Sequence, residues 1–257
     1  MSSEREDGVV NFRLHGRVGA GVVLVSLISS VMWIVASGAA PGAESVKRPL
    51  ASAESREKTA FFQAICRHDT MTVRKLLKQN KALVRAVDTF GGETGLMDAA
   101  EVGDAVVTKL LLGSGADVNA RNDIGETALH RAAYSDSVPV IDALVAGGAG
   151  LEQGDEIGGT ALANAAGNGN LHAVRELLRL GAHVDAGDHS GWTGLIKAAS
   201  SGRLDVIRVL VAAGAKIDRK AKFADLTPEP DMDAIDAAKM CNQPEIAAYL
   251  RAHLVRR

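Results

Sequence analysis

The amino-acid sequence predicts an all-α fold in which short helices stack into an elongated solenoid. Three observations carry this prediction: a tripeptide that recurs every 33 residues, a helical stripe of apolar residues in each repeat, and a Gly-Ala pair that ends each stripe. A fixed self-similarity of this length is typical of repeat proteins, in which each unit packs only against its neighbours. We therefore expect one continuous core rather than separate globular domains.

The recurring tripeptide begins with threonine and ends with leucine. Its four threonines, spaced 33 residues apart, are Thr94, Thr127, Thr160 and Thr193. A threonine hydroxyl caps a helix by accepting a hydrogen bond from a free N–H in the first turn. Two alanines follow each threonine five and six residues later, and such small side chains let neighbouring helices approach closely. This segment therefore predicts the first helix of each unit.

A second helix is indicated further along each unit by apolar residues at helical spacing. In one unit these residues are Ile141, Leu144 and Val145, which occupy positions i, i+3 and i+4. A Gly-Ala pair such as Gly148-Ala149 then follows, and glycine adopts the left-handed conformation that ends a helix at little steric cost. The remainder, for example residues 117–125, is polar and rich in turn residues. One unit is therefore helix, turn, helix and hairpin-like loop.

Two segments resemble ankyrin repeats: Thr127–Ala133 (T-A-L-H-R-A-A) and Gly115–Asn122 (G-A-D-V-N-A-R-N). The period and the T-P-L-H-x-A signature of that family match. Glycine or alanine replaces the usual proline after the threonine, and only one repeat keeps the histidine, His130. The resemblance covers residues 57–254 and implies an ankyrin-repeat solenoid of about six units. These lie near residues 59–92, 93–125, 126–158, 159–191, 192–224 and 232–254.

The first unit departs from the pattern, as terminal repeats do because one of their faces meets solvent. Thr59 takes the place of the capping threonine, and Asn80 stands where later units have the helix-ending glycine. Asn80 is therefore expected in the left-handed conformation, which asparagine tolerates better than most residues. Lys75, Lys78 and Lys81 are expected on the exposed face.

The last unit begins at Asp233, which fills the threonine position 40 residues after Thr193. Seven residues are therefore inserted, and they fall within residues 219–232. One interpretation is a loop extension, because long surface insertions cost little free energy. The other is a finger that lengthens the binding surface.

An uncharged run of 23 residues, from 18 to 40, follows Arg13, His15 and Arg17 near the start of the chain. It is long enough for a membrane span of roughly 20 residues, and its small-residue end is typical of a signal-peptidase site. We expect residues 1–40 to be a signal peptide or a membrane-anchor helix, and residues 41–56 to be a linker. The protein is then exported, either periplasmic or anchored to the inner membrane and facing the periplasm.

The two cysteines, Cys66 and Cys241, are expected to remain unpaired within the chain. They lie five repeats apart, which corresponds to roughly 50 Å at the usual spacing of packed helices. A disulfide allows only about 7 Å between its Cα atoms. Both cysteines align with variable positions of the repeat, so we expect partly exposed thiols.

Composition and motifs give no indication of catalysis, of a cofactor or of a nucleic-acid partner. The formal net charge is −2, and no nucleophile elbow, zinc-protease motif or phosphate-binding loop is present. Acid pairs such as Asp155-Glu156 fall on hairpin tips, so no buried acid–base pair is expected. His183, Asp185, Asp188 and His189 fall in one loop, but turn chemistry explains these aspartates better than a metal site.

The ankyrin resemblance implies that a partner is contacted by the hairpin tips and the first helix of each unit. Trp192 stands where other units have Glu or Gly, so it is either an interface anchor or a residue that packs on the neighbouring hairpin. The acidic positions gather in the first half of this surface, which suits a partner with a basic patch. The candidate contact residues are Phe90, Asp98, Asp123, Glu126, Arg131, Tyr134, Glu156, His189, Trp192 and Lys197.

We therefore predict a non-catalytic protein-binding module, monomeric and exported, with a possible membrane tether through residues 18–40. The resemblance to exported bacterial ankyrin-repeat proteins implies that it acts as a scaffold, or as a protective or inhibitory binder, of one partner protein. The alternative is a secreted effector that acts on the proteins of another cell. An enzyme is the third and weakest hypothesis.

Overall fold

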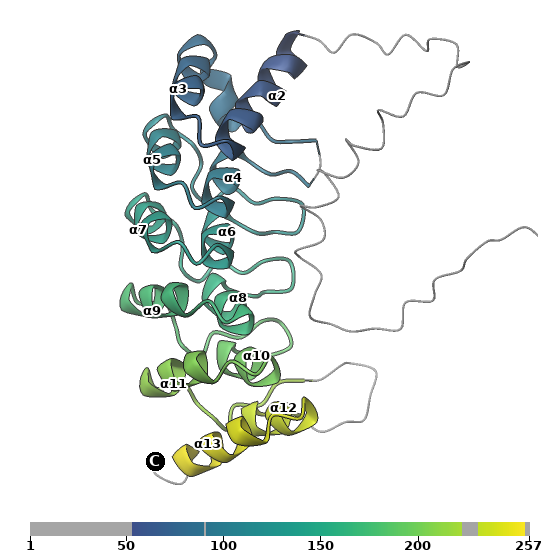
Figure 1. The fold of residues 1–257 in the computed structure, drawn as a ribbon. Helices are drawn as coiled ribbons and strands as arrows, with labels where there is room; N and C mark the ends of the chain where they lie inside the picture. Colours follow the sequence, from purple (N-terminus) through teal and green to yellow (C-terminus); the bar gives the residue numbers. More distant parts are fainter. Residues whose placement is uncertain (1–52, 90, 223–230, 255–257) are drawn as a thin grey trace, which may run out of the picture. The chain divides into compact units, whose positions relative to one another are not determined.

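The computed structural model describes residues 53–89, 91–222 and 231–254 (Figure 1). Within these residues, α-helices follow one another in six consecutive pairs, and no strand is formed. The predicted all-α repeat fold is therefore confirmed for this part of the chain. None of its helices combines the length and the apolar character that crossing a bilayer requires. The predicted signal or anchor helix, residues 1–40, lies outside the described residues.

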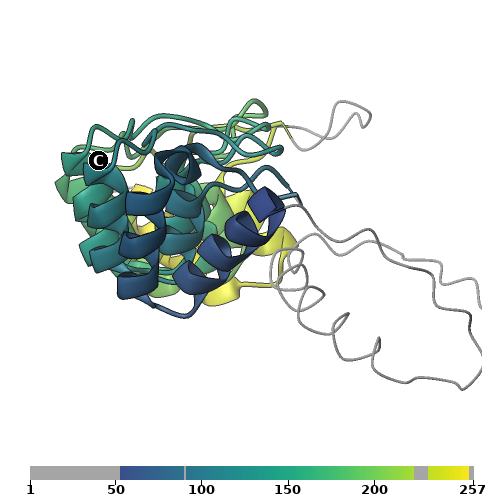
Figure 2. The same ribbon diagram turned by 90° about the horizontal axis from the view of Figure 1, so that it is seen from above.

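The helices form two rows, each built from one member of every pair (Figure 1). The first row contains α2 (Ala53–Cys66), α4 (Gly95–Glu101), α6 (Ala128–Tyr134), α8 (Ala161–Asn168), α10 (Gly194–Ser200) and α12 (Ala234–Met240). The second row contains α3 (Thr70–Gln79), α5 (Ala105–Gly113), α7 (Val138–Ala146), α9 (Leu171–Arg179), α11 (Leu204–Ala212) and α13 (Pro244–Leu254). Every first-row helix packs against the next one, and the second row does the same from α3 to α11. The loops between pairs gather along one side of the stack (Figure 2).

The core runs through the stack as one continuous cluster from Phe61 to Leu250. Its centre is formed by the repeated alanine pairs, of which Ala132 and Ala133 are both 0% exposed. Larger side chains of the second row, such as Ile141 and Leu144, fill the space between the two rows. Among the residues that the structure describes, every core residue belongs to the stack, so the fragment 51–257 keeps the side chains of this described core.

The first helices begin at the predicted threonines. The hydroxyls of Thr94, Thr160 and Thr193 each accept a hydrogen bond from the backbone N–H three residues on, at 3.3, 3.3 and 3.4 Å. In the remaining unit, the N–H of Thr127 donates to Nδ1 of His130 at 3.2 Å. Because Nδ1 accepts, the ring proton lies on Nε2, which donates to the carbonyl of Gly159 at 2.9 Å. The single histidine of the signature therefore joins two units.

The start of the first unit differs from the prediction. α2 begins at Ala53, so residues 53–56, predicted as part of the linker, are helical, while residues 41–52 lie outside the described residues. Thr59 is not a cap but an interior residue of α2, where its hydroxyl donates to the carbonyl of Ser55 at 2.8 Å. The segment from 53 to 58 is rich in Ala, Glu, Arg and Lys, which favour helix wherever packing imposes no other conformation.

The predicted left-handed conformation of Asn80 is wrong, because its φ is −140°. Its side-chain oxygen instead accepts from the N–H of Ala82 at 3.0 Å and starts a short 3-10 helix, η1 (Lys81–Arg85). Thr59 and Thr94 are 35 residues apart rather than 33, and the two extra residues of this unit lengthen its loop through this added turn. The helix-ending glycines of the later units behave as predicted, as Gly148 does with φ of 93°.

The insertion before the last unit begins and ends at paired residues. Ala221 and Met232 exchange two backbone hydrogen bonds of 2.9 and 2.8 Å. Residues 223–230 lie outside the described residues, so the finger and the loop extension both stay predictions. Beyond the insertion, Asp233 caps α12 by accepting from the N–H groups of Ile235 and Asp236.

Both cysteines are free and exposed, as predicted. Cys66 ends α2 and Cys241 follows α12, so they belong to the first and the last helix pairs. The stack itself separates the two thiols.

Gly181 and Gly113 form a matched pair for testing the role of the left-handed glycines. At Gly181, φ is +98° and no atom lies within 4 Å of the point that a Cβ would occupy, so Gly181→Val meets backbone strain alone. We expect the free energy of unfolding to fall by about 2 kcal/mol, measured by urea denaturation. Gly113 ends α5 with open space around it. There Gly113→Ala should raise the free energy of unfolding by up to about 1 kcal/mol. Equal losses of stability at both positions would contradict the role assigned to the left-handed conformation of Gly181.

Candidate protein-binding surface

The hairpin tips form a continuous row along the stack. Each tip donates one backbone hydrogen bond to the tip before it, which fixes the predicted contact residues Asp123, Glu156 and His189 at regular positions. Phe90, the equivalent residue of the first tip, lies outside the described residues. The bonds run from Asp123 N to Gly91 O (2.9 Å), from Glu156 N to Ile124 O (3.0 Å), from His189 N to Ile157 O (2.9 Å) and from Lys222 N to Ser190 O (2.8 Å).

Four hairpins are each held closed by an Asp or Asn side chain that sequence reasoning did not select as a contact residue. This side chain accepts a hydrogen bond from the backbone N–H of the residue that precedes the next threonine. The recurrence of an Asp or Asn at positions 122, 155 and 188 was the sequence signal that could have identified these hairpin-closing residues. The bonds are Asp88 to Glu93 N (3.0 Å), Asn122 to Glu126 N (2.8 Å), Asp155 to Gly159 N (2.8 Å) and Asp188 to Trp192 N (2.9 Å).

The same bonding explains the loop that was weighed as a metal site. Asp188 closes its hairpin, and the carboxylate of Asp185 accepts from the N–H of Lys216 at 2.9 Å. Asp188 thus acts within its own turn, as interpreted from the sequence, whereas Asp185 bonds to the next unit. In the part of the chain that the structure describes, no three His, Cys, Asp or Glu side chains are grouped to hold a metal ion.

Four of the predicted residues meet in one charged cluster between α4 and α6. Asp98 lies on α4, Arg131 and Tyr134 lie on α6, and Glu126 directly precedes the threonine that starts α6. Two further carboxylates complete the group. We call it the acidic cluster: Glu93, Asp98, Glu101, Glu126, Arg131 and Tyr134.

The guanidinium of Arg131 is shared among three carboxylates. It forms an ion pair with Glu93 of the preceding unit, and its Nε lies 3.2 Å from Glu126 Oε2. Its Nη1 lies 3.6 Å from Glu101 Oε2. The hydroxyl of Tyr134 donates to Glu126 Oε1 at 2.9 Å. The side chains of Arg131, Glu93 and Glu126 are 13%, 14% and 4% exposed, whereas that of Glu101 is 45% exposed.

Negative charge exceeds positive charge in this cluster. Burial, together with the carboxylates of Glu93 and Glu101, raises the pKa of Asp98 to about 7. Burial also raises the pKa of Glu93, although Arg131 opposes the shift. Glu93 Oε2 and Glu126 Oε2 accept no hydrogen bond from any described residue. These two oxygens are buried, and Glu126 Oε2 already faces Arg131 Nε, so the negative charge that a cationic group can reach lies at the exposed edge of the cluster, on Glu101.

Sequence reasoning missed the ion pair between Arg131 and Glu93. Arg131 and Glu93 are 38 positions apart, and they meet only because adjacent units stack in register. The sequence identified the positions of the two residues within their units, but not their contact.

A second polar group lies further along the first row and contains one ammonium and two carboxylates. The ammonium of Lys197 lies 3.3 Å from Asp188 Oδ2 and donates to Asn164 Oδ1 at 3.3 Å. Asn164 in turn donates to Asp155 Oδ2 at 3.0 Å. Lys197 therefore links two units and is already paired.

A family model described as ankyrin repeats (three copies) matches residues 61–155 and 129–221, which together make up more than half of the chain. The chain belongs to the ankyrin-repeat family. A comparison with curated proteins found no match. Ankyrin repeats are protein–protein interaction modules and are typically non-catalytic.

Trp192 packs on the neighbouring hairpin, which is one of the two arrangements predicted for it. Its ring packs against the core of the ankyrin stack, and its Nε1–H donates to the carbonyl of Lys222 in the next hairpin at 2.9 Å. It is half-buried rather than freely presented. Its role as an interface anchor stays a prediction.

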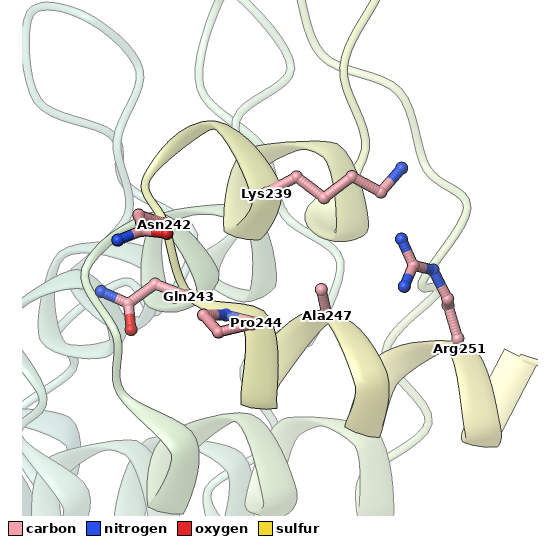
Figure 3. A pocket seen from close by; sticks show the side chains of 6 residues that line it. All are labelled: Lys239, Asn242, Gln243, Pro244, Ala247 and Arg251. Atoms are coloured by element: carbon pink, nitrogen blue, oxygen red, sulfur yellow. The ribbon is translucent and has the colours of Figure 1, made fainter.

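A depression of about 300 Å³ lies between α12 and α13 (Figure 3), which form the last helix pair of the described stack. Asn242 and Gln243 lie at one end of it and Arg251 at the other. Its lining includes cations and amides but no carboxylate, so it offers no pair of acid and base. The lining residues are Lys239, Asn242, Gln243, Pro244, Ala247 and Arg251.

Asp98→Asn should stabilise the ankyrin domain in a pH-dependent way. The pKa of Asp98 rises from 3.8 to about 7 on folding, so the folded chain holds this proton more tightly and loses stability as the pH rises between these values. If the whole pKa shift of Asp98 is converted into free energy of unfolding, it corresponds to about 4 kcal/mol. Because Asp98 keeps partial solvent contact, we expect about 2 kcal/mol at pH 8 and little at pH 4. Urea denaturation at both pH values measures this, and equal effects at both would contradict the proposed electrostatic cause.

Proposed function

We propose that this ankyrin-repeat chain is a non-catalytic, monomeric binding protein that holds one partner protein through the acidic cluster. The observation that carries the proposal is the surplus of carboxylates around Arg131, of which Glu101 forms the exposed edge. The stack does not require charge at these positions, since the equivalent residues of other units include Asn164 and Gly159.

The chemistry of the cluster favours a partner that presents an arginine or a lysine. Glu101 is exposed and gives access to Asp98, which lies one helical turn earlier on α4. A cationic side chain placed between them would form charge-assisted hydrogen bonds, which are stronger than neutral ones. It would also relieve the repulsion among the carboxylates.

Charge reversal at the accessible edge of the cluster tests this proposal. Glu101→Lys should weaken capture of the partner from a cell extract by about tenfold or more, because like charges across an interface repel. Glu245→Lys, at an exposed position of α13, is the matched control and should leave capture unchanged. Quantitative pull-down with the fragment 51–257 measures both variants.

The pH dependence of the same capture gives an independent test. A bound cation favours the charged form of Asp98, so binding releases a proton, and affinity should rise as the pH increases through about 7. Asp98→Asn should abolish this dependence. Capture that survives Glu101→Lys and shows no change between pH 6 and pH 8 would place the partner elsewhere.

We propose further that the protein is exported and acts as a scaffold, or as a protective or inhibitory binder, of its partner. The uncharged run from 18 to 40, preceded by Arg13 and Arg17, supports export. Cell fractionation with N-terminal sequencing of the mature protein is the test, and we expect the protein in the envelope fraction. Recovery of a shortened chain from the medium would favour a secreted effector, and an intact chain in the cytoplasm would contradict export.

A further inference from the structure

A stripe of cations covers the exposed face of α3. Arg74, Lys75 and Lys78 are all exposed, whereas Val73 and Leu77 on the opposite face are buried. Positions i, i+3, i+4 and i+7 of a helix share one face, so these cations are aligned with the exposed Met71. None of the three forms an ion pair with another described residue. The wider segment 67–85 carries six Lys and Arg residues against one acid, Asp69, whose carboxylate caps α3.

The neighbouring helix α5 continues this pattern. Val106 occupies the place on α5 that Met71 occupies on α3, and Lys109 follows it by one turn. Met71 is 75% exposed and Val106 is 62% exposed, so both apolar side chains project into solvent. α3 and α5 pack side by side in the second row (Figure 1). We call Met71, Arg74, Lys75, Lys78, Val106 and Lys109 the basic face.

The place of α3 in the terminal repeat does not explain why the exposed charges along this helix face are all positive. A terminal repeat needs a polar outer surface for solubility, and charges of either sign supply it. The other terminal repeat carries both signs, with Asp236 and Lys239 on α12 and Glu245 and Arg251 on α13. The whole chain has a formal net charge of −2. The concentration of cations on α3 and α5 is therefore a local property beyond what capping requires.

We propose that the basic face docks on an anionic membrane surface. Lysine and arginine are attracted to anionic headgroups, and each contributes about fivefold to binding. Met71 and Val106 project from the same face, and apolar side chains enter the headgroup region of a bilayer, whereas a nucleic-acid backbone offers them no counterpart. The stack begins at Ala53, and Glu57 in the first part of α2 accepts a hydrogen bond of 2.9 Å from Asn80 at the end of α3. Residues 41–52 span at most about 40 Å, so an apolar segment inserted at 18–40 would keep the first repeat close to the bilayer.

Vesicle co-sedimentation tests the proposal with the fragment 51–257, which contains the whole core of the stack and lacks the apolar run. It should bind vesicles of phosphatidylcholine and phosphatidylglycerol, but not phosphatidylcholine alone, and added salt should weaken the binding. The triple variant Arg74→Gln, Lys75→Gln, Lys78→Gln should bind roughly a hundredfold more weakly. Met71→Ser should lower binding several-fold, because the apolar contact is lost. All four positions are exposed, so circular dichroism and thermal melting should show intact folding.

A second triple variant removes the same charge elsewhere: Arg175→Gln, Lys216→Gln, Arg251→Gln, all at exposed positions. It should bind anionic vesicles as the parent fragment does. Equal losses in the two triple variants would show that net charge alone matters and would overturn the assignment to this face. No binding to anionic vesicles, equal binding to neutral ones, or binding to RNA without binding to vesicles would overturn the proposal itself.

Discussion

Small side chains at the centre of the first row set the distance between units, and the remaining contacts depend on that distance. The alanine pairs lie fully buried between neighbouring first-row helices. Gly95 shows how close this packing is, because a Cβ placed there would lie 2.8 Å from the ring of Phe61. Wider spacing would break the bond from His130 to Gly159 and the single bonds that join the hairpin tips. Since each unit touches only its neighbours, the stability of the stack is the sum of such interfaces.

The regular units were predictable because their determinants are local and repeated. A capping threonine, an alanine pair and an apolar stripe each act within one helix, so their spacing predicts helix positions without knowledge of the neighbours. Prediction failed in the first unit for the same reason. Thr59 fits the threonine position by spacing, but α2 has no preceding unit to set its start, and helix-favouring residues extend it back to Ala53. Asn80 likewise follows a local preference when its side chain caps η1.

The candidate site was predictable as a set of positions but not as a set of contacts. Asp98, Glu126, Arg131 and Tyr134 were chosen for their places in the repeat. Their meeting with Glu93 depends on the register between units, which a single unit's sequence does not express. The same holds for Trp192, whose bond to Lys222 reaches into the next hairpin. A lone sequence shows that an aromatic residue departs from the repeat, but the neighbouring loop decides whether its ring is presented to solvent.

A solenoid specifies its internal contacts and leaves its outer positions free, so charge at those positions can separate without disturbing the fold. This chain has nearly balanced net charge, yet carboxylates gather on α4 and directly before α4 and α6 in the first row, and cations gather on the second row at α3 and α5. The two groups belong to the same end of the stack but to different rows. A cationic partner held at the acidic cluster and an anionic surface met by α3 would therefore contact different helices. The acidic cluster repels an anionic surface, and the basic face repels a cationic partner. A single repeat domain can therefore keep the two interactions apart.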